Sequence, residues 1–132
     1  MKKLLLPILI LILSFIAGYS VLSIWIGVSL YRENPSREDL QKVIRLTPSN
    51  PDPYYRMALL YEWDIRNIDL KQSLHFLKKA IENNPLEQQY WIHLAKILFR
   101  IREKEASEKA LEKAVLVFPT GYQGRWVGGN LL

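Results

Sequence analysis

Two histidines and one pair of carboxylates are the residues of this sequence whose types could do chemistry. His75 and His93 could bind a metal or act as general bases, and Glu62 and Asp64 could form an acid–base pair. Neither histidine has a nearby cysteine or an H-x-x-x-H partner, which a metal site would need. Glu62 and Asp64 lie two helical positions apart, so their side chains point in different directions. We therefore expect surface or interface histidines and carboxylates at a solvated helix end.

Motifs for catalysis and cofactor binding are missing from the sequence. It contains no cysteine, no glycine-rich phosphate loop and no G-x-S-x-G turn. We expect no catalytic residue, no metal and no cofactor, and hence a protein that is not an enzyme. The formal net charge is +5, but after Tyr31 the basic and acidic residues are interleaved, as on a solvated helical surface. Nucleic-acid binding is disfavoured, because it would want a basic stripe with presented aromatic residues.

The N-terminal quarter is apolar. Residues 4–30, LLLPILILILSFIAGYSVLSIWIGVSL, contain no charge. Roughly 20 apolar residues in a helix cross a ~30 Å hydrocarbon core, and Trp25 and Tyr31 stand where aromatic rings favour the headgroup region. The pattern predicts that residues 1–31 are a transmembrane helix, a membrane anchor whose residues 4–30 contact lipid.

A cleaved signal peptide is the competing interpretation, because Lys2 and Lys3 precede the apolar run. A signal peptide has about 7–15 apolar residues followed by a small-x-small site. Here the run continues past Ala17 and Gly18, which favours an uncleaved signal-anchor. The lysines favour a cytoplasmic N-terminus, so the remainder would be periplasmic or extracytoplasmic. The small-xxx-small spacings 14–18 and 23–27 would let this helix associate with another.

Beyond the anchor, apolar residues recur at helical spacing. Trp91, Leu94, Ala95 and Leu98 follow the i, i+3, i+4, i+7 pattern of one helix face. A second such set is Ala110, Leu111, Ala114 and Val115. The polar stretch 102–105 between them is short, so the two helices form an antiparallel hairpin.

Pro119 follows Pro85 by 34 residues, the period of the tetratricopeptide repeat. The pattern of bulky and small residues in this hairpin resembles that family: Trp91, Leu94, Ala95, Leu98, Ser107, Leu111, Ala114 and Pro119. A preceding repeat has the corresponding residues Tyr54, Met57, Ala58, Tyr61, Ser73, Leu77, Ala80 and Pro85. Pro48 precedes Pro85 by 37 residues, and we assign the three extra residues to the turn between the two helices.

The resemblance implies an all-α fold, with the N-terminal transmembrane helix followed by a short solenoid of helical hairpins. Residues 32–50 would be a linker and a half-repeat helix capped by Asn34. Residues 51–85 and 86–119 would be the two hairpins. Residues 120–132 would be an incomplete further repeat or tail, which frays, docks on the last hairpin or continues into a longer protein.

In the family, the first helices of the repeats line a concave groove that receives a partner peptide or helix. Carried over to matching positions, the resemblance implies that a partner protein binds Tyr55, Leu59, Glu62, Trp63, Ile92, Lys96, Phe99 and Arg100. The Lys and Asn pattern with which some members hold a C-terminal carboxylate is missing, since Tyr55, Leu59, Ile92 and Lys96 occupy those places.

The function implied is a membrane-anchored protein-interaction module, a scaffold or assembly factor. Two alternatives remain open. The chain could be a constitutive structural subunit of a larger membrane complex whose transmembrane helix makes the specific contact. It could also be the N-terminal fragment of a longer envelope or polymer-export protein.

Overall fold

All regular structure in the described part of the chain is helical, as the sequence predicts. The computed structural model describes the backbone of residues 2–30 and 35–119, and their side chains except those of residues 2–6, 9, 24 and 26–30. The chain divides into two compact units, Met1–Pro48 and Ser49–Leu132. The predicted tail 120–132 lies outside the described residues.

The first unit contains helices α1 (Lys2–Leu30) and α2 (Arg37–Leu46). Apolar side chains of α1 are solvent-exposed: Leu11 by 71%, Phe15 by 79% and Val21 by 68%. The Ser20 hydroxyl donates to the carbonyl of Ile16 at 2.9 Å, so this polar group is satisfied within its own helix. Among the described residues, no helix meets the combined length and hydropathy that a membrane crossing requires. The expected lipid contact of residues 4–30 falls partly on side chains that the structure does not describe.

Helix α2 starts at a capping box. The Asp39 amide donates to the Ser36 hydroxyl oxygen at 3.2 Å, and the Ser36 amide donates to Asp39 Oδ2 at 3.3 Å. The helix is therefore capped by Ser36 rather than by Asn34, because this reciprocal pair satisfies two otherwise free amides. Hydrogen bonding to Ser36 also lowers the pKa of Asp39. Among the residues of α2, Leu40 and Val43 are buried.

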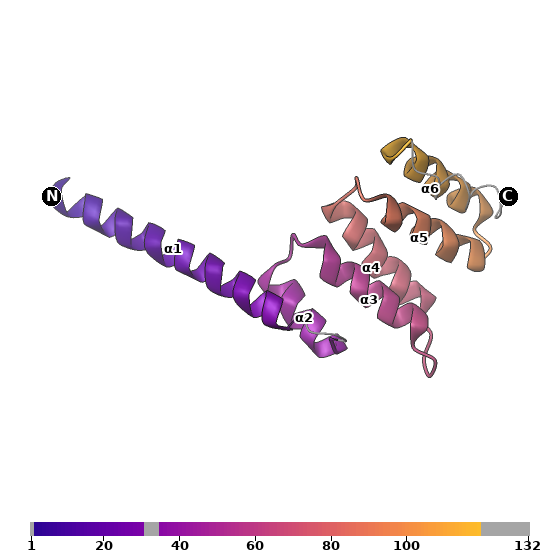
Figure 1. Ribbon diagram of the computed structural model, residues 1–132, viewed down its shortest axis with the longest axis horizontal. Helices are drawn as coiled ribbons and strands as arrows, with labels where there is room; N and C mark the ends of the chain where they lie inside the picture. The colour runs from indigo at the N-terminus through magenta and orange to yellow at the C-terminus, as the bar shows by residue number, and fades with distance from the viewer. Residues whose placement is uncertain (1, 31–34, 120–132) are drawn as a thin grey trace. The chain divides into compact units, whose positions relative to one another are not determined.

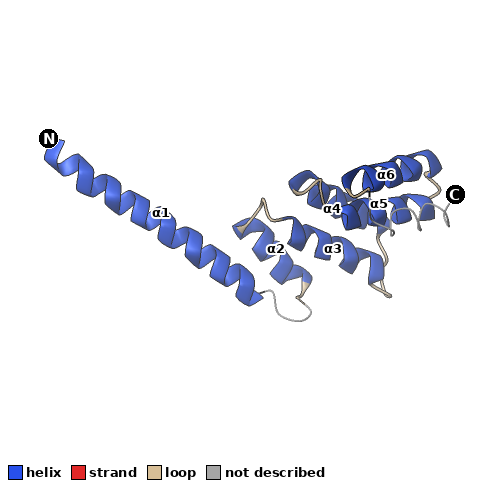
Figure 2. Cartoon of the chain, turned by 45° about the horizontal axis from the view of Figure 1, so that its top comes forward, coloured by secondary structure: helices blue, strands red, loops and turns tan. Residues whose placement is uncertain are grey.

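The second unit contains four successive helices: α3 (Pro51–Trp63), α4 (Leu70–Asn83), α5 (Gln88–Arg100) and α6 (Lys104–Val117). Helix α3 packs on α4 and α5 packs on α6, while α4 also packs on α5 and joins the two hairpins (Figure 1; Figure 2). The α3–α4 turn spans residues 64–69 and the α5–α6 turn spans residues 101–103. The three extra residues thus lie in the first turn, where the proline spacing places them.

In both hairpins, a serine hydroxyl of the second helix forms a hydrogen bond with a backbone carbonyl of the first helix. The Ser73 hydroxyl of α4 donates to the carbonyl of Ala58 in α3 at 2.8 Å. In the next hairpin, the Ser107 hydroxyl of α6 donates to the carbonyl of Ala95 in α5 at 2.9 Å. All four residues are buried. The small side chains let each helix pair approach closely, and the hydroxyl finds its acceptor on the partner backbone.

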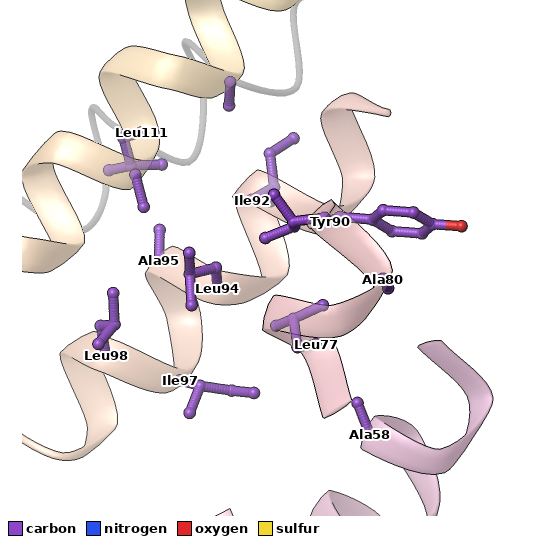
Figure 3. Packing of buried hydrophobic residues seen from close by; sticks show 13 residues of the cluster. Ala58, Leu77, Ala80, Tyr90, Ile92, Leu94, Ala95, Ile97, Leu98 and Leu111 are labelled. Atoms are coloured by element: carbon purple, nitrogen blue, oxygen red, sulfur yellow. The ribbon is translucent and has the colours of Figure 1, made fainter. Parts of the chain in front are cut away.

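The hydrophobic core continues across both hairpins. In Figure 3, Leu77 of α4 lies towards α5, and Leu111 of α6 lies on the other side of α5. Ile97 and Ala95 of α5 are fully buried between them. Trp91 contacts the linker between α4 and α5, where its indole Nε1–H donates a hydrogen bond to the carbonyl of Pro85 at 2.8 Å. The bond ties the tryptophan to the proline that stands six residues before it.

Candidate functional site

The first helices of the two hairpins, α3 and α5, meet along one face through aromatic side chains. Tyr55 of α3 is half-buried, and its ring centroid lies 4.7 Å from that of Tyr90 on α5. The Tyr55 ring also meets the His93 ring edge-on at 5.5 Å between centroids. Such tilted and edge-on pairs are favourable geometries for aromatic rings. The side of the two helices that carries these contacts is called the α3–α5 face below.

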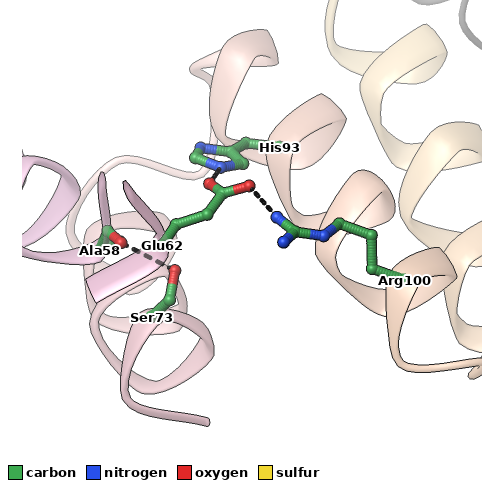
Figure 4. Close-up of polar contacts among 5 residues, drawn as sticks. All are labelled: Ala58, Glu62, Ser73, His93 and Arg100. Carbon is green, nitrogen blue, oxygen red and sulfur yellow. Dashed lines mark hydrogen bonds and ion pairs between the residues drawn. The ribbon is translucent and has the colours of Figure 1, made fainter. Parts of the chain in front are cut away.

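Further along the same face, a buried carboxylate of α3 binds two residues of α5. Glu62 is 7% exposed, and its Oε1 accepts a hydrogen bond from Arg100 Nη1 at 2.6 Å while its Oε2 contacts His93 Nε2 (Figure 4). Both carboxylate oxygens are thereby engaged. Removing a charge from water costs several kcal/mol unless partners compensate it. The cluster therefore ties the two hairpins together.

The structure corrects the expectation for Glu62 as part of a solvated helix end. Asp64, the other carboxylate of the expected pair, is the C-cap of α3. Its Oδ1 accepts a hydrogen bond from the backbone amide of Arg66 at 3.1 Å. The two carboxylates thus have separate structural roles. No group of three or more histidine, cysteine and acidic side chains gathers as a metal site among the residues described.

Two carboxylates, those of Asp52 and Glu87, lie towards the opposite end of the α3–α5 face, where Asp52 forms an ion pair with Arg56 at 3.6 Å. Burial raises the pKa of Tyr90 to about 12, and the carboxylates of Asp52 and Glu87 add to this effect. Burial likewise raises the pKa of Tyr55, with further contributions from Glu62, Glu87 and Asp52. Asp52 lies in the first turn of α3 and Glu87 is the N-cap of α5. Negative charge at these positions also suits the positive ends of the two helices.

Comparison with known proteins connects this geometry to a family. The family model described as tetratricopeptide repeat matches residues 88–120. That range contains the hairpin α5–α6, which is thus similar to a tetratricopeptide repeat. A solved structure, the crystal structure of MamA, shares the fold with a TM-score of 0.63 at 18% sequence identity. The match covers 72% of this chain and 54% of that chain, so this chain spans about half of its length. A comparison with curated proteins found no match.

The tetratricopeptide-like fold places the eight residues of the implied partner surface in different environments. Trp63 is 72% exposed and Phe99 is 43% exposed. Lys96 and Arg100 are exposed, whereas Tyr55 and Leu59 are half-buried. Ile92 is only 3% exposed and belongs to the core, and Glu62 is committed to its two partners on α5. The accessible part of the set therefore consists of aromatic and cationic side chains.

Tyr90 and His93 complete the face but were not among the residues implied by the resemblance. In the sequence, His93 and Arg100 are seven residues apart. Residues at this spacing lie on the same side of a helix. Glu62 stands on the preceding first helix, one repeat earlier. Pairing a carboxylate with two basic groups at this spacing is the signal that could have found the cluster. The sequence by itself does not tell which side of α3 faces α5.

Proposed function

We propose that this chain is a membrane-anchored scaffold or assembly factor that binds a partner protein on the α3–α5 face. A tetratricopeptide-like helical repeat suggests a protein–protein interaction module. The observation that carries the proposal is the exposure of Trp63 on α3 and of Lys96, Phe99 and Arg100 on α5. Aromatic residues and arginine are the types that contribute most to binding energy at protein interfaces. The proposed role is binding without catalysis.

Burial of these aromatic side chains by a partner supplies a favourable free energy. Fully covering a large apolar side chain contributes about 1.5–3 kcal/mol. Two exposed aromatic rings, one on each of the helices α3 and α5, thus offer a useful part of the binding free energy of a weak or transient complex. The cluster around Glu62 keeps α3 and α5 in register, so the face is formed before the partner arrives, which lowers the entropic cost of binding.

The proposed anchor is the uncharged segment 4–30. Helix α1 contains 29 residues, which at about 1.5 Å per residue gives about 43 Å, longer than a ~30 Å hydrocarbon core. The exposed apolar side chains of Leu11, Phe15 and Val21 would be covered by lipid. With Lys2 and Lys3 on the cytoplasmic side, the hairpins would lie outside the cytoplasm. Tethering to the membrane would raise the effective concentration of a partner held at the same surface.

Site-specific photo-crosslinking in native membranes tests the proposal. A photo-crosslinking residue replaces Phe99 on the α3–α5 face in one variant and Glu112 on the exposed side of α6 in a matched control. We expect one discrete protein adduct from position 99 and none from position 112. Equal labelling from both positions, or no adduct from position 99, would show that this face does not bind a partner.

A further inference from the structure

Arg100 is held in place on the α3–α5 face while much of its side chain remains accessible. The side chain is 44% exposed, although Nη1 donates to Glu62 Oε1 at 2.6 Å. A guanidinium group carries five N–H donors, and this bond uses one of them. Glu62 is 7% exposed and is itself fixed by its contact with His93. The buried carboxylate therefore orients Arg100 and leaves donors for a ligand.

Lys96 adds a second cation one helical turn before Arg100. The positions i and i+4 lie on the same side of α5, and both residues are exposed. No ion pair of Lys96 is found within the described part of the chain. Glu62 compensates the charge of Arg100, which leaves the positive charge of Lys96 without a carboxylate among the described residues. One carboxylate would balance it.

Two aromatic side chains are exposed next to Arg100 and Glu62 in the chain. Phe99 lies between the two cations in the sequence of α5 and is 43% exposed, and Trp63, which follows Glu62 on α3, is 72% exposed. A ligand that matches this surface has an apolar side chain close to a negative charge. Towards the other end of the face, Asp52 and Glu87 act on Tyr90. Because Asp52 is paired with Arg56, the carboxylate of Glu87 is the group that disfavours a second negative charge there.

We propose that the partner inserts a segment with a single Asp or Glu side chain next to an aromatic or aliphatic residue. Its carboxylate binds Lys96 and Arg100, and its apolar neighbour packs on Phe99 and Trp63. The inference rests on the proposed function and specifies the partner of that same face. The segment is internal in its chain, because an acidic residue at a C-terminus would bring a second negative charge. The acidic residue lies at the Lys96 end, away from Asp52 and Glu87.

Selection from a displayed library of random peptides tests the proposal without a known partner. The full-length chain in lipid nanodiscs is the bait, and empty nanodiscs remove lipid-binding peptides. We expect the enriched peptides to share one acidic residue within about three positions of an aromatic or aliphatic residue, the spacing that spans one helical turn. An enriched peptide is then synthesised with a free and with an amidated C-terminus.

Fluorescence anisotropy measures the affinity of the synthetic peptide for the full-length chain. We expect Lys96→Gln, or replacement of the peptide's Glu by Gln, to weaken binding about tenfold, since a charge-assisted contact contributes roughly 1.4 kcal/mol. The matched control Lys113→Gln alters an exposed lysine of α6 and should leave the affinity unchanged. C-terminal amidation of the peptide should also have no effect.

Enriched peptides without an acidic preference, no enriched peptide, or equal effects of Lys96→Gln and Lys113→Gln overturn the proposal. Loss of binding on amidation overturns it as well, because the ligand would then be a chain terminus. The crosslinking experiment at position 99 measures the proposed function separately. If position 99 gives an adduct and one of these results is also obtained, the α3–α5 face still binds a partner, and only the proposal of an acidic segment is wrong.

Discussion

At position 62, a buried carboxylate receives a guanidinium group and an imidazole ring from the next hairpin. Replacing Glu62 by Gln keeps the shape of the side chain but removes the charge that compensates Arg100. Because hydrogen bonds to charged groups contribute about 1.5–3 kcal/mol, we expect Glu62→Gln to lower the free energy of unfolding by about that amount. Urea unfolding followed by circular dichroism measures it.

Glu112→Gln is the control for this prediction, since Glu112 lies on the exposed side of α6 and no ion pair involving it is found among the described residues. It should leave the unfolding midpoint unchanged. If the two variants behave alike, the cluster around Glu62 does not stabilise the fold.

Because the pKa of Tyr90 is raised in the folded chain, we expect the protein to lose stability at alkaline pH. This pKa is raised to about 12 in the folded chain from an ordinary value of 10.0, chiefly by burial. Between these two values the unfolded chain binds fewer protons than the folded chain, so the free energy of unfolding falls as the pH rises from about 10 to about 12. We expect Tyr90→Phe to show a weaker pH dependence in that interval. Urea titrations at pH 9 and 11 on both proteins give the comparison, and identical slopes would contradict the prediction.

At the scale of elements, helix α5 is followed by an arginine in the left-handed conformation, where glycine is usual. Arg102 has φ of 66°, its amide donates to the carbonyl of Phe99 at 3.0 Å, and the Glu103 amide donates to the carbonyl of Leu98 at 2.9 Å. These two bonds define a Schellman motif, in which the left-handed position is usually glycine. A left-handed conformation costs a residue with a side chain roughly 1–2 kcal/mol.

We therefore expect Arg102→Gly to raise the free energy of unfolding by about 0.5–1 kcal/mol, since part of the relieved strain is offset by the greater freedom of glycine in the unfolded chain. Lys113→Gly in the middle of α6 should have the opposite effect, a loss of about 1 kcal/mol. Thermal unfolding of the two variants beside the parent protein measures both. A destabilised Arg102→Gly would mean that the arginine side chain makes a stabilising contact at the turn.

The hairpins themselves follow from local signals that act at short range. Prolines, small residues and the 3.6-residue periodicity predict where α5 and α6 lie, because these signals depend on neighbouring residues only. The cap of α2 differed from expectation, since Ser36 and Asp39 satisfy each other's amides whereas Asn34 precedes the helix by more than one position. Caps depend on which of several adjacent polar residues closes a hydrogen bond, and helix boundaries are correspondingly hard to assign.

At the scale of the whole molecule, the prediction concerns the N-terminal segment. If residues 4–30 anchor the chain, the full-length protein should sediment with membranes after alkaline washing, and a variant lacking residues 1–30 should stay in the supernatant. Circular dichroism checks that the shortened variant keeps its helices. Sedimentation of both proteins would place the membrane contact elsewhere.

The same deletion separates the scaffold from the alternative of a structural subunit that is recognised through its transmembrane helix. In a pull-down from solubilised membranes, a scaffold that binds through the α3–α5 face keeps its partner without residues 1–30. A subunit held by its transmembrane helix loses the partner.

The sequence by itself determined the helical class, the pairing of helices into hairpins and the position of the longer turn, because periodicity, proline spacing and small residues such as Ser73 and Ala95 act within one repeat. Only the tertiary structure decided which side chains of the implied partner surface remain accessible. The rotation of α3 against α5 buries Glu62 against His93 and Arg100 and places Ile92 in the core. That rotation results from packing between residues more than thirty positions apart, about which local patterns carry no information.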